Sequence, residues 1–378
     1  MPAVIVGYAR SPFTPARKGA LARTRPDDIA AAVVNRLISD VGVDPSLVED
    51  LIVGCAFPEA EQGYNLARII TFLTDLPETV PGVTINRFCG SSMQSIHDAA
   101  ARINSEQGDA FIAGGVESMS RVPMTGFNPL PNPNLADEAM TSMGITAENL
   151  SKRHDIGRDA QEAFAIESQA RATAARESGA FSDEIVAIET SDGTVSEDGC
   201  IRPGTNSEAL SKLRPAFDSN GTVTAGTSSP LTDGAAFVFV CSEEFAAEHG
   251  LDPMARIKSI GVSGCAPEIM GIGPVSASQK ALERADLSLD DIDLIELNEA
   301  FAAQSLAVIG ELGLDTDKVN IEGGAIALGH PLGASGARIT GKAAQLIHKR
   351  GVENALATLC VGGGMGMATV LELSLIHI

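Results

Sequence analysis

The chain has 378 residues, and its 49 acidic side chains outnumber its 27 lysines and arginines, which gives a formal net charge of −22. Such an acidic surface repels nucleic-acid backbones and anionic lipid headgroups, so we expect neither as the main partner. Hydrophobic residues make up 44% of the chain, enough for a sizeable core, and glycine is abundant at 38 residues. No segment offers the ~20 apolar residues of a membrane helix or the pattern of a secretion signal, so we expect a cytoplasmic protein.

Short apolar runs alternate with alanine-rich stretches, which is the pattern of an α/β protein. In the first third of the chain, we expect strands at 3–8, 51–55, 83–86 and 110–114 and helices at 26–41 and 91–103. A similar order recurs late in the chain, with helices expected at 277–285 and 334–349, strands at 292–297, 319–322 and 355–361, and a further strand after the glycines at 362–364. This recurrence suggests two related α/β halves.

The middle of the chain differs from both halves in its composition and in its expected elements. It opens with a proline- and asparagine-rich stretch at 123–133, contains one long expected helix at 159–178, and continues in loops rich in serine, aspartate and glycine. We therefore divide the chain into an N-terminal α/β half (1–117), an inserted loop domain (118–248) that holds the closing strand of the N-terminal half near its end, and a C-terminal α/β half (249–373). Residues 374–378 form an apolar tail that we set aside as foreign to the fold.

The six cysteines are scattered without the spacing of a zinc site, so we expect no metal centre. Cys55, Cys200, Cys241 and Cys265 are interpreted as small buried hydrophobic residues. Cys89 differs because it lies between an expected strand and an expected helix, where unpaired N–H groups favour a thiolate. This arrangement resembles a nucleophile elbow, although a cysteine at a strand end is more often inert.

Three further residues are candidates for chemistry. His330 lies in a glycine-rich loop before a helix, and an imidazole is well suited to take a thiol proton near neutral pH. Asn298 lies between a strand and a helix, where its amide could polarise a carbonyl, hold a water or simply cap the helix. Cys360 ends an expected strand and leads into the glycines at 362–364, whose backbone N–H groups could bind an oxyanion.

Together these segments resemble the thiolase family, in order and along nearly the whole chain. The matching stretches are 86–94 (NRFCGSSMQ), 224–236 (TAGTSSPLTDGAA), 298–303 (NEAFAA), 323–336 (GGAIALGHPLGASG) and 360–364 (CVGGG). The resemblance implies a five-layered αβαβα core built from two similar halves with an inserted loop domain. It also implies a homodimer or a dimer of dimers.

The resemblance implies a role for each candidate residue. Cys89 would be the nucleophile that carries the acyl group, and His330 would deprotonate it and help polarise the thioester carbonyl. Cys360 would be the second acid and base, which moves the proton on the α-carbon. Asn298 would hold a water that forms one oxyanion site with His330, and the backbone N–H groups of Cys89 and Gly362 would form the other.

The resemblance further implies that Ser229 contacts the pantetheine arm of coenzyme A and that Arg202 lies near its nucleotide. Coenzyme A would be a substrate, and no tightly bound cofactor is expected. The reaction would be thiolytic cleavage of 3-ketoacyl-CoA by a degradative enzyme of fatty-acid oxidation. A partner subunit with hydratase and dehydrogenase activities would fit that pathway.

Three alternatives stay open. Acetyl-CoA acetyltransferase is the nearest, but members dedicated to acetoacetyl-CoA usually carry a histidine where Ser142 precedes residues 143–149 here. A ketoacyl synthase would typically lack a second catalytic cysteine, so Cys360 weighs against it. An inactive acyl-CoA-binding protein is disfavoured by the complete set of candidate residues.

Overall fold

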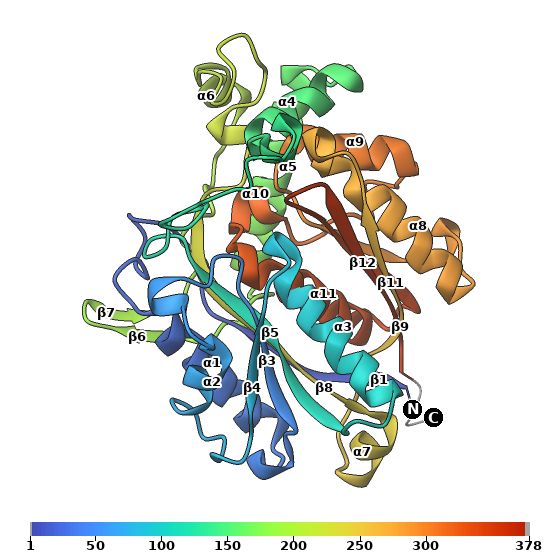
Figure 1. Ribbon diagram of the computed structural model, residues 1–378. Helices are drawn as coiled ribbons and strands as arrows, with labels where there is room; N and C mark the ends of the chain where they lie inside the picture. The colour runs from blue at the N-terminus through green and yellow to red at the C-terminus, as the bar shows by residue number, and fades with distance from the viewer. Residues whose placement is uncertain (1, 375–378) are drawn as a thin grey trace.

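The computed structural model describes residues 2–374, so all but the first residue of the tail at 374–378 lies outside the described residues. One sheet runs through the molecule in the order β10-β11-β12-β9-β1-β8-β5-β3-β4 (Figure 1). Its strands are β1 (Ala3–Arg10), β3 (Asp50–Gly54), β4 (Gly82–Ile85), β5 (Ala110–Ser118), β8 (Thr232–Ser242), β9 (Ala255–Gly264), β10 (Leu294–Leu297), β11 (Asn354–Val361) and β12 (Met365–Glu372), and the short β2 (Thr14–Pro15) pairs with β8. Strands β1 and β9 pair only through Val4 and Ile5, so the sheet consists of two parts joined at a narrow seam.

The two parts of the sheet repeat one topology. In the first, β3 is parallel to β4 and β5, and β8 is antiparallel to both β5 and β1. In the second, β10 is parallel to β11, and β12 is antiparallel to both β11 and β9. The expectation of two similar α/β halves is confirmed.

The strand expected at 319–322 is wrong. Only Val319 pairs with β10, through an isolated parallel bridge to Ile295. Asn320 adopts a left-handed conformation (φ 47°), and its side chain bonds the backbone N–H and C=O of Leu297 at 2.9 and 2.8 Å. The side-chain hydrogen bonds of Asn320 therefore replace the strand ladder that the apolar run predicted.

Helices form three layers around the two parts of the sheet. The outer layers are α1 (Pro26–Val41) with α2 (Leu66–Thr71) on one side and α8 (Gly273–Ala285) with α9 (Ala302–Leu312) on the other. Between the parts lie α3 (Ser91–Asn104) and α11 (Leu332–Arg350), which share a core with strands of both (Figure 1). The alternation of helices and sheet confirms the five-layered core.

The remaining elements belong mainly to the chain between β5 and β8. They are α4 (Met143–Arg153), α5 (Arg158–Glu177), β6 (Ile188–Thr190), β7 (Gly193–Val195) and α6 (Ser207–Ser211), with α7 (Glu243–Glu248) and α10 (Ala325–Leu328) elsewhere. Helix α4 packs against α9, and α5 packs against α9 and α10, so this segment covers one end of the core (Figure 1). The domain boundaries stay a prediction. Within residues 2–374, no helix is long and apolar enough to cross a membrane.

Candidate active site

Cys89 lies in a tight 3₁₀ turn (Phe88–Gly90) that connects β4 to α3. Phe88 is held in the left-handed region at φ 45°, a strained conformation for a bulky residue. The Asn86 side chain accepts the Phe88 N–H at 2.8 Å and donates to the Ala56 carbonyl at 2.9 Å. Ser91 donates to the Phe88 carbonyl at 2.6 Å. The expected strand, sharp turn and helix around Cys89 are therefore present.

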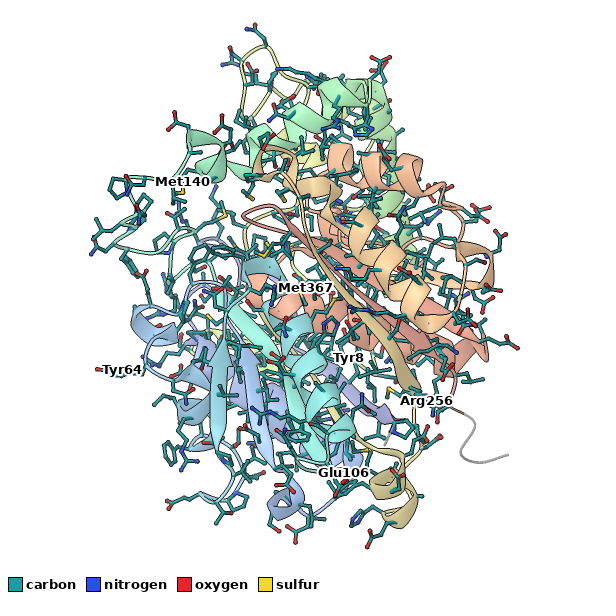
Figure 2. The ribbon with its side chains drawn as sticks, turned by 45° about the vertical axis from the view of Figure 1, so that its right-hand side comes forward. Tyr8, Tyr64, Glu106, Met140, Arg256 and Met367 are labelled. Carbon is teal, nitrogen blue, oxygen red and sulfur yellow. The ribbon has the colours of Figure 1, made fainter. Side chains whose placement is uncertain are left out.

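The close approach of Gly90 brings the Cys89 turn against the second half of the protein. A Cβ atom at Gly90 would lie 2.4 Å from the sulfur of Met367, which Figure 2 shows in the centre of the molecule. Burial raises the pKa of Cys89 to about 11, against the opposing effect of the backbone N–H of Gly362. Burial likewise raises the pKa of Cys360, and the nearby Cys89 sulfur adds to that rise. The structure thus brings Cys89, Gly362 and Cys360 together.

The ring of His330 is buried, and its contacts define which nitrogen carries the proton. Ser335 donates its hydroxyl proton to the Pro331 carbonyl at 3.0 Å, so its oxygen, 2.6 Å from Nδ1, accepts the Nδ1–H. The Nδ2 amide of Asn298 lies 3.4 Å from Nε2. Burial, with a smaller contribution from the charge of Arg338, lowers the pKa of His330 to about 3. The assigned tautomer leaves a neutral imidazole with an Nε2 lone pair that can accept a proton.

The two groups of residues meet in one place. Cys89 packs against a small cluster of side chains that includes Leu332, two residues after His330. Asn298 follows β10 and donates its backbone N–H at 3.0 Å to the carbonyl of Thr358 in β11, two residues before Cys360. Asn298 therefore connects the strand that carries Cys360 to the ring of His330. The interpretation of Asn298 as a helix cap is wrong, because α9 begins only after its N-cap at residue 301.

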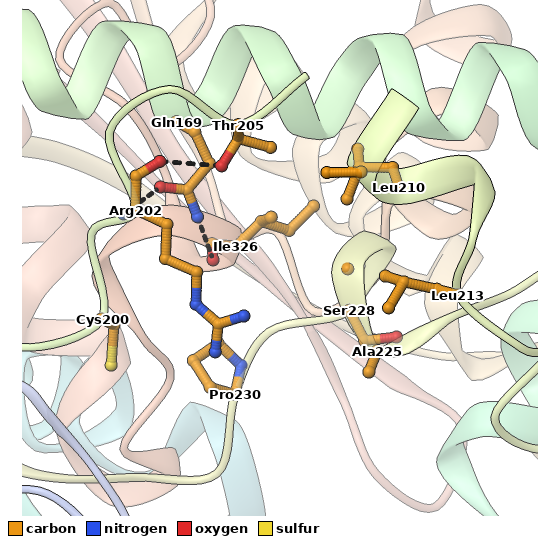
Figure 3. Close-up of a pocket in the computed structure, with 12 residues that line it drawn as sticks. Gln169, Cys200, Arg202, Thr205, Leu210, Leu213, Ala225, Ser228, Pro230 and Ile326 are labelled. Atoms are coloured by element: carbon orange, nitrogen blue, oxygen red, sulfur yellow. Dashed lines mark hydrogen bonds between the residues drawn. The ribbon is translucent and has the colours of Figure 1, made fainter. Parts of the chain in front are cut away.

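The two residues expected to contact coenzyme A lie near a pocket of about 200 Å³ (Figure 3). Arg202 is exposed and lines this pocket with Ser228 and Pro230. Ser229 is half-buried and not part of the lining, and its N–H and Oγ donate to the Ala300 carbonyl at 3.0 and 3.1 Å. Two residues further on, the chain forms a β-bridge with His330. The segment that carries Ser229 therefore connects the pocket to the candidate active site.

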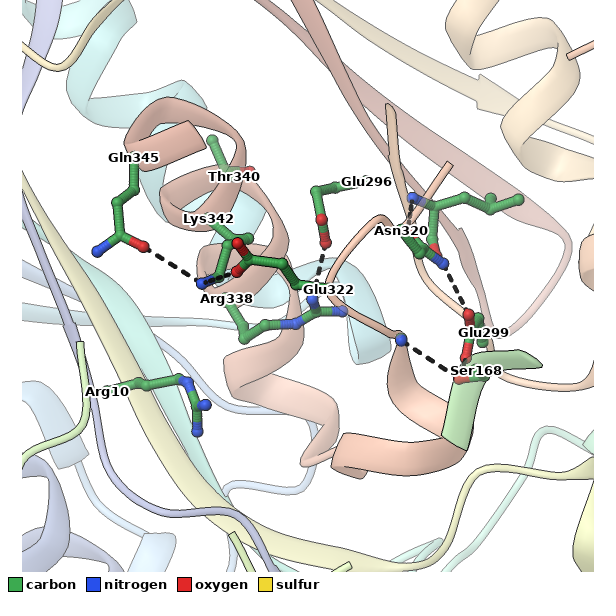
Figure 4. A network of polar contacts seen from close by, with 12 residues as sticks. Arg10, Ser168, Glu296, Glu299, Asn320, Glu322, Arg338, Thr340, Lys342 and Gln345 are labelled. Atoms are coloured by element: carbon green, nitrogen blue, oxygen red, sulfur yellow. Dashed lines mark hydrogen bonds and ion pairs between the residues drawn. The ribbon is translucent and has the colours of Figure 1, made fainter. Parts of the chain in front are cut away.

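Sequence reasoning missed two buried carboxylates, Glu117 and Glu299. Glu299 accepts hydrogen bonds from Ser168 Oγ at 2.6 Å and from Asn320 Nδ2 at 2.8 Å (Figure 4). Ser168 also accepts the N–H of Gly324 at 3.3 Å, which fixes the glycine-rich loop before α11. The available signal for Glu299 was an acidic residue closely following a buried strand.

The remaining cysteines are not expected to be catalytic, although Cys200 lines the pocket near Arg202 and Cys265 contributes to the raised pKa of Cys360. Cys55, Cys200 and Cys241 are buried, as expected, but the expectation is wrong for Cys265, which is only partly buried. The reason is its position directly after the end of β9, where the chain leaves the sheet. Within residues 2–374, no cluster of histidine, cysteine, aspartate or glutamate could hold a metal ion.

A duplicated five-layered α/β core with a buried histidine and two cysteines at one point is the architecture of a cysteine-based acyltransferase. Residues 3–244 match the thiolase N-terminal domain family, and residues 251–373 match the thiolase C-terminal domain family. The chain belongs to the thiolase family.

The similar proteins cover nearly the whole chain. It is 48% identical to a 3-ketoacyl-CoA thiolase of Bacillus subtilis (98% of this chain, 99% of the relative) and 49% identical to one of Idiomarina loihiensis (98% of each). Among solved structures, human mitochondrial 3-ketoacyl-CoA thiolase in complex with CoA matches with a TM-score of 0.92 at 39% identity (99% of this chain, 98% of that one). Bacillus anthracis acetyl-CoA acetyltransferase matches with a TM-score of 0.90 at 40% identity (98% of each).

Proposed function

We propose that this chain is a 3-ketoacyl-CoA thiolase that transfers an acyl group between 3-ketoacyl-CoA and coenzyme A through a thioester on Cys89. The observation that carries the proposal is the convergence of Cys89 and Cys360 from the two halves of the chain: a Cβ atom at Gly90 would lie 2.9 Å from the Val361 side chain, and the charge of Cys89 raises the pKa of Cys360. Relatives named 3-ketoacyl-CoA thiolase, at 48–49% identity over nearly the full length, support the substrate class.

The first half-reaction breaks a carbon–carbon bond. His330 Nε2 takes the thiol proton as the Cys89 sulfur attacks the 3-keto carbon, and the resulting oxyanion is held by the backbone N–H groups of Cys89 and Gly362. When the C2–C3 bond breaks, its electron pair forms the enolate of acetyl-CoA, and Cys360 supplies the proton to the α-carbon. Acetyl-CoA leaves, and the shortened acyl group remains on Cys89.

The second half-reaction transfers the acyl group. The thiol of coenzyme A loses its proton to the Cys360 thiolate and attacks the thioester carbonyl. The Cys89 sulfur then leaves and regains its proton from His330, which restores the resting enzyme. Asn298, whose Oδ1 has no hydrogen-bond partner among residues 2–374, would hold the water that stabilises the enolate with His330.

Thiolysis of a series of 3-ketoacyl-CoAs tests this proposal. We expect cleavage of acetoacetyl-CoA and of longer 3-ketoacyl-CoAs in the presence of coenzyme A, and Cys89→Ala should abolish it. Cys241→Ala is the matched control, because Cys241 lies buried in β8 within the core between the sheet and α1. Full turnover by Cys89→Ala would refute the proposal. Reaction with the four-carbon substrate alone would identify the acetyl-CoA acetyltransferase instead, which the 40% identical Bacillus anthracis structure keeps as the second candidate.

Coenzyme A binding, assembly and location are part of the same proposal. Arg202 and Ser229 would contact coenzyme A, so Arg202→Ala should raise the KM for coenzyme A more than it lowers kcat.

Among the described residues, β4 is an edge strand of the sheet, and Tyr64 in the chain segment before it is 97% exposed (Figure 2), which favours a homodimer through this edge. Light scattering would distinguish it from a monomer or a dimer of dimers. A hydratase and dehydrogenase partner subunit and a cytoplasmic location stay predictions, tested by pull-down and by cell fractionation.

A further inference from the structure

Glu117, near the end of β5, is 1% exposed and sits at a junction of three chain segments. Its Oε2 accepts the backbone N–H of Ala56 at 2.8 Å and that of Gly333 at 2.9 Å. Its Oε1 accepts the Gln62 side-chain amide at 2.8 Å and the Phe57 N–H at 3.3 Å. One carboxylate therefore ties the end of β3 to the first turn of α11.

The charge of Glu117 is not neutralised by an ion pair within the described part of the chain. Burial raises its pKa, and the N–H donors oppose that rise. A buried carboxylate without a cation is costly, and a neutral side chain of similar shape would avoid that cost. The retained charge points to a role beyond packing.

Two hydrogen-bonded paths lead from Glu117 to the candidate catalytic residues. On one path, the Ala56 carbonyl accepts the Asn86 amide, and Asn86 accepts the N–H of Phe88, the strained residue directly before the nucleophile. On the other path, Gly333 lies three residues after the candidate base. A Cβ atom at Gly333 would lie 2.8 Å from Glu117 Oε2, so only glycine allows this approach.

We propose that Glu117 is a positioning residue whose carboxylate fixes the Cys89 turn and the His330 loop relative to each other. The inference rests on the proposed roles of Cys89 and His330. The charge of the carboxylate also raises the pKa of Cys89. Cys360 from β11 also lies near the Cys89 sulfur, whose charge raises the pKa of Cys360, while the neutral His330 comes from the loop before α11. The N–H groups of Gly362 and Cys89 act in the opposite sense.

Glu117→Gln tests the inference, because it keeps the size of the side chain and removes its charge. We expect kcat to fall about 100-fold with little change in KM, since a shift of about 1 Å between reacting groups costs that much. We also expect the pH profile of Cys89 alkylation to move to lower pH. Glu148→Gln is the matched control: Glu148 is equally buried and accepts the N–H groups of Thr222 and Val223 at 2.9 Å, but its charge does not act on Cys89.

Glu117→Asp separates position from charge, and it serves if Glu117→Gln does not fold. It keeps the carboxylate but shortens the reach, so kcat should fall while the alkylation profile stays close to that of the unmodified chain. Wild-type kcat in Glu117→Gln with an unmoved alkylation profile would overturn the inference, as would equal shifts in Glu148→Gln. Absence of thiolysis in the unmodified chain would instead refute the proposed function, and the alkylation profile would still report whether Glu117 acts on Cys89.

Discussion

The structure predicts that Cys89 rests as a neutral thiol beside a neutral imidazole. Burial raises the pKa of Cys89 to about 11 and lowers that of His330 to about 3. The gap of about 8 pKa units corresponds to about 11 kcal/mol for moving the proton at rest, before the attraction between the resulting charges is counted. At pH 8, about one molecule in 1,000 would carry the thiolate, against about one in four for an unperturbed cysteine with a pKa of about 8.5. Proton transfer should therefore accompany attack on the substrate.

The rate of Cys89 alkylation by iodoacetamide measures this prediction. Peptide mass spectrometry would follow the modified Cys89 between pH 6 and pH 10, which separates it from the other five cysteines. Because only the thiolate reacts, the rate should rise about tenfold per pH unit up to pH 10. A Cys241 peptide provides the buried control, with a pKa that burial raises to about 12. A rate that levels off between pH 7 and pH 8 would show a preformed thiolate–imidazolium pair and refute the reasoning.

Three further predictions concern stability and packing. Burial lowers the pKa of His97 to about 3, so as the pH falls below about 6.5 this histidine is protonated in the unfolded chain but stays neutral in the folded one. The free energy of unfolding therefore falls with pH. In chemical denaturation, His97→Asn should reduce that fall between pH 7 and pH 5 by about 2 kcal/mol. Arg338→Met should destabilise the fold by about 3–5 kcal/mol in the same assay, because it removes the ion-pair partner, 2.8 Å away, of the buried Glu296, whose pKa burial already raises to about 7. A loss below about 1 kcal/mol would contradict this. Gly90→Ala should lower the free energy of unfolding by about 1–3 kcal/mol and slow turnover, since its Cβ would collide with Met367, and unchanged kinetics would contradict the close approach.

Local elements are predictable because their signals lie close together in the chain. The sequence predicts a helix at 26–41, and α1 spans Pro26–Val41, with Pro26 in the first turn and the left-handed Gly42 after its end. The long helix expected at 159–178 is present as α5, within one residue at each end. Proline, glycine and apolar periodicity define such boundaries without tertiary contacts.

Features that depend on distant contacts are not predictable from local signals. The strand expected at 319–322 fails because Asn320 bonds the backbone of Leu297, and nothing in the apolar run signals that bond. Glu117 carries no local signal of its role, because its hydrogen-bond donors lie between 55 and 216 residues away in sequence. The spatial proximity of Cys89 and Cys360 could be expected only from the family resemblance.

The repeated topology explains why chemically different residues meet at one point. Strands β3 and β5 last pair at Gly54 and Gly115, and β10 and β11 last pair at Leu297 and Thr358. Two residues beyond the last pair, the first half carries a carboxylate at position 117 where the second half carries a thiol at position 360. Glu117 thus occupies in its half the position that the proposed second acid and base occupies in the other.

The same equivalence relates the nucleophile to its base. Cys89 lies one residue before the N-cap of α3, and His330 lies one residue before the N-cap of α11. The two helices are in close contact near their N-terminal ends, since a Cβ atom at Gly336 would lie 2.4 Å from the backbone nitrogen of Met93. Helix N-termini favour negative charge and disfavour a cation, which agrees with a neutral His330 and with stabilisation of an oxyanion. The duplicated scaffold therefore supplies two helix N-termini that carry partial positive charge. At equivalent positions before these helices, one half carries the proposed nucleophile, Cys89, and the other carries the proposed base, His330.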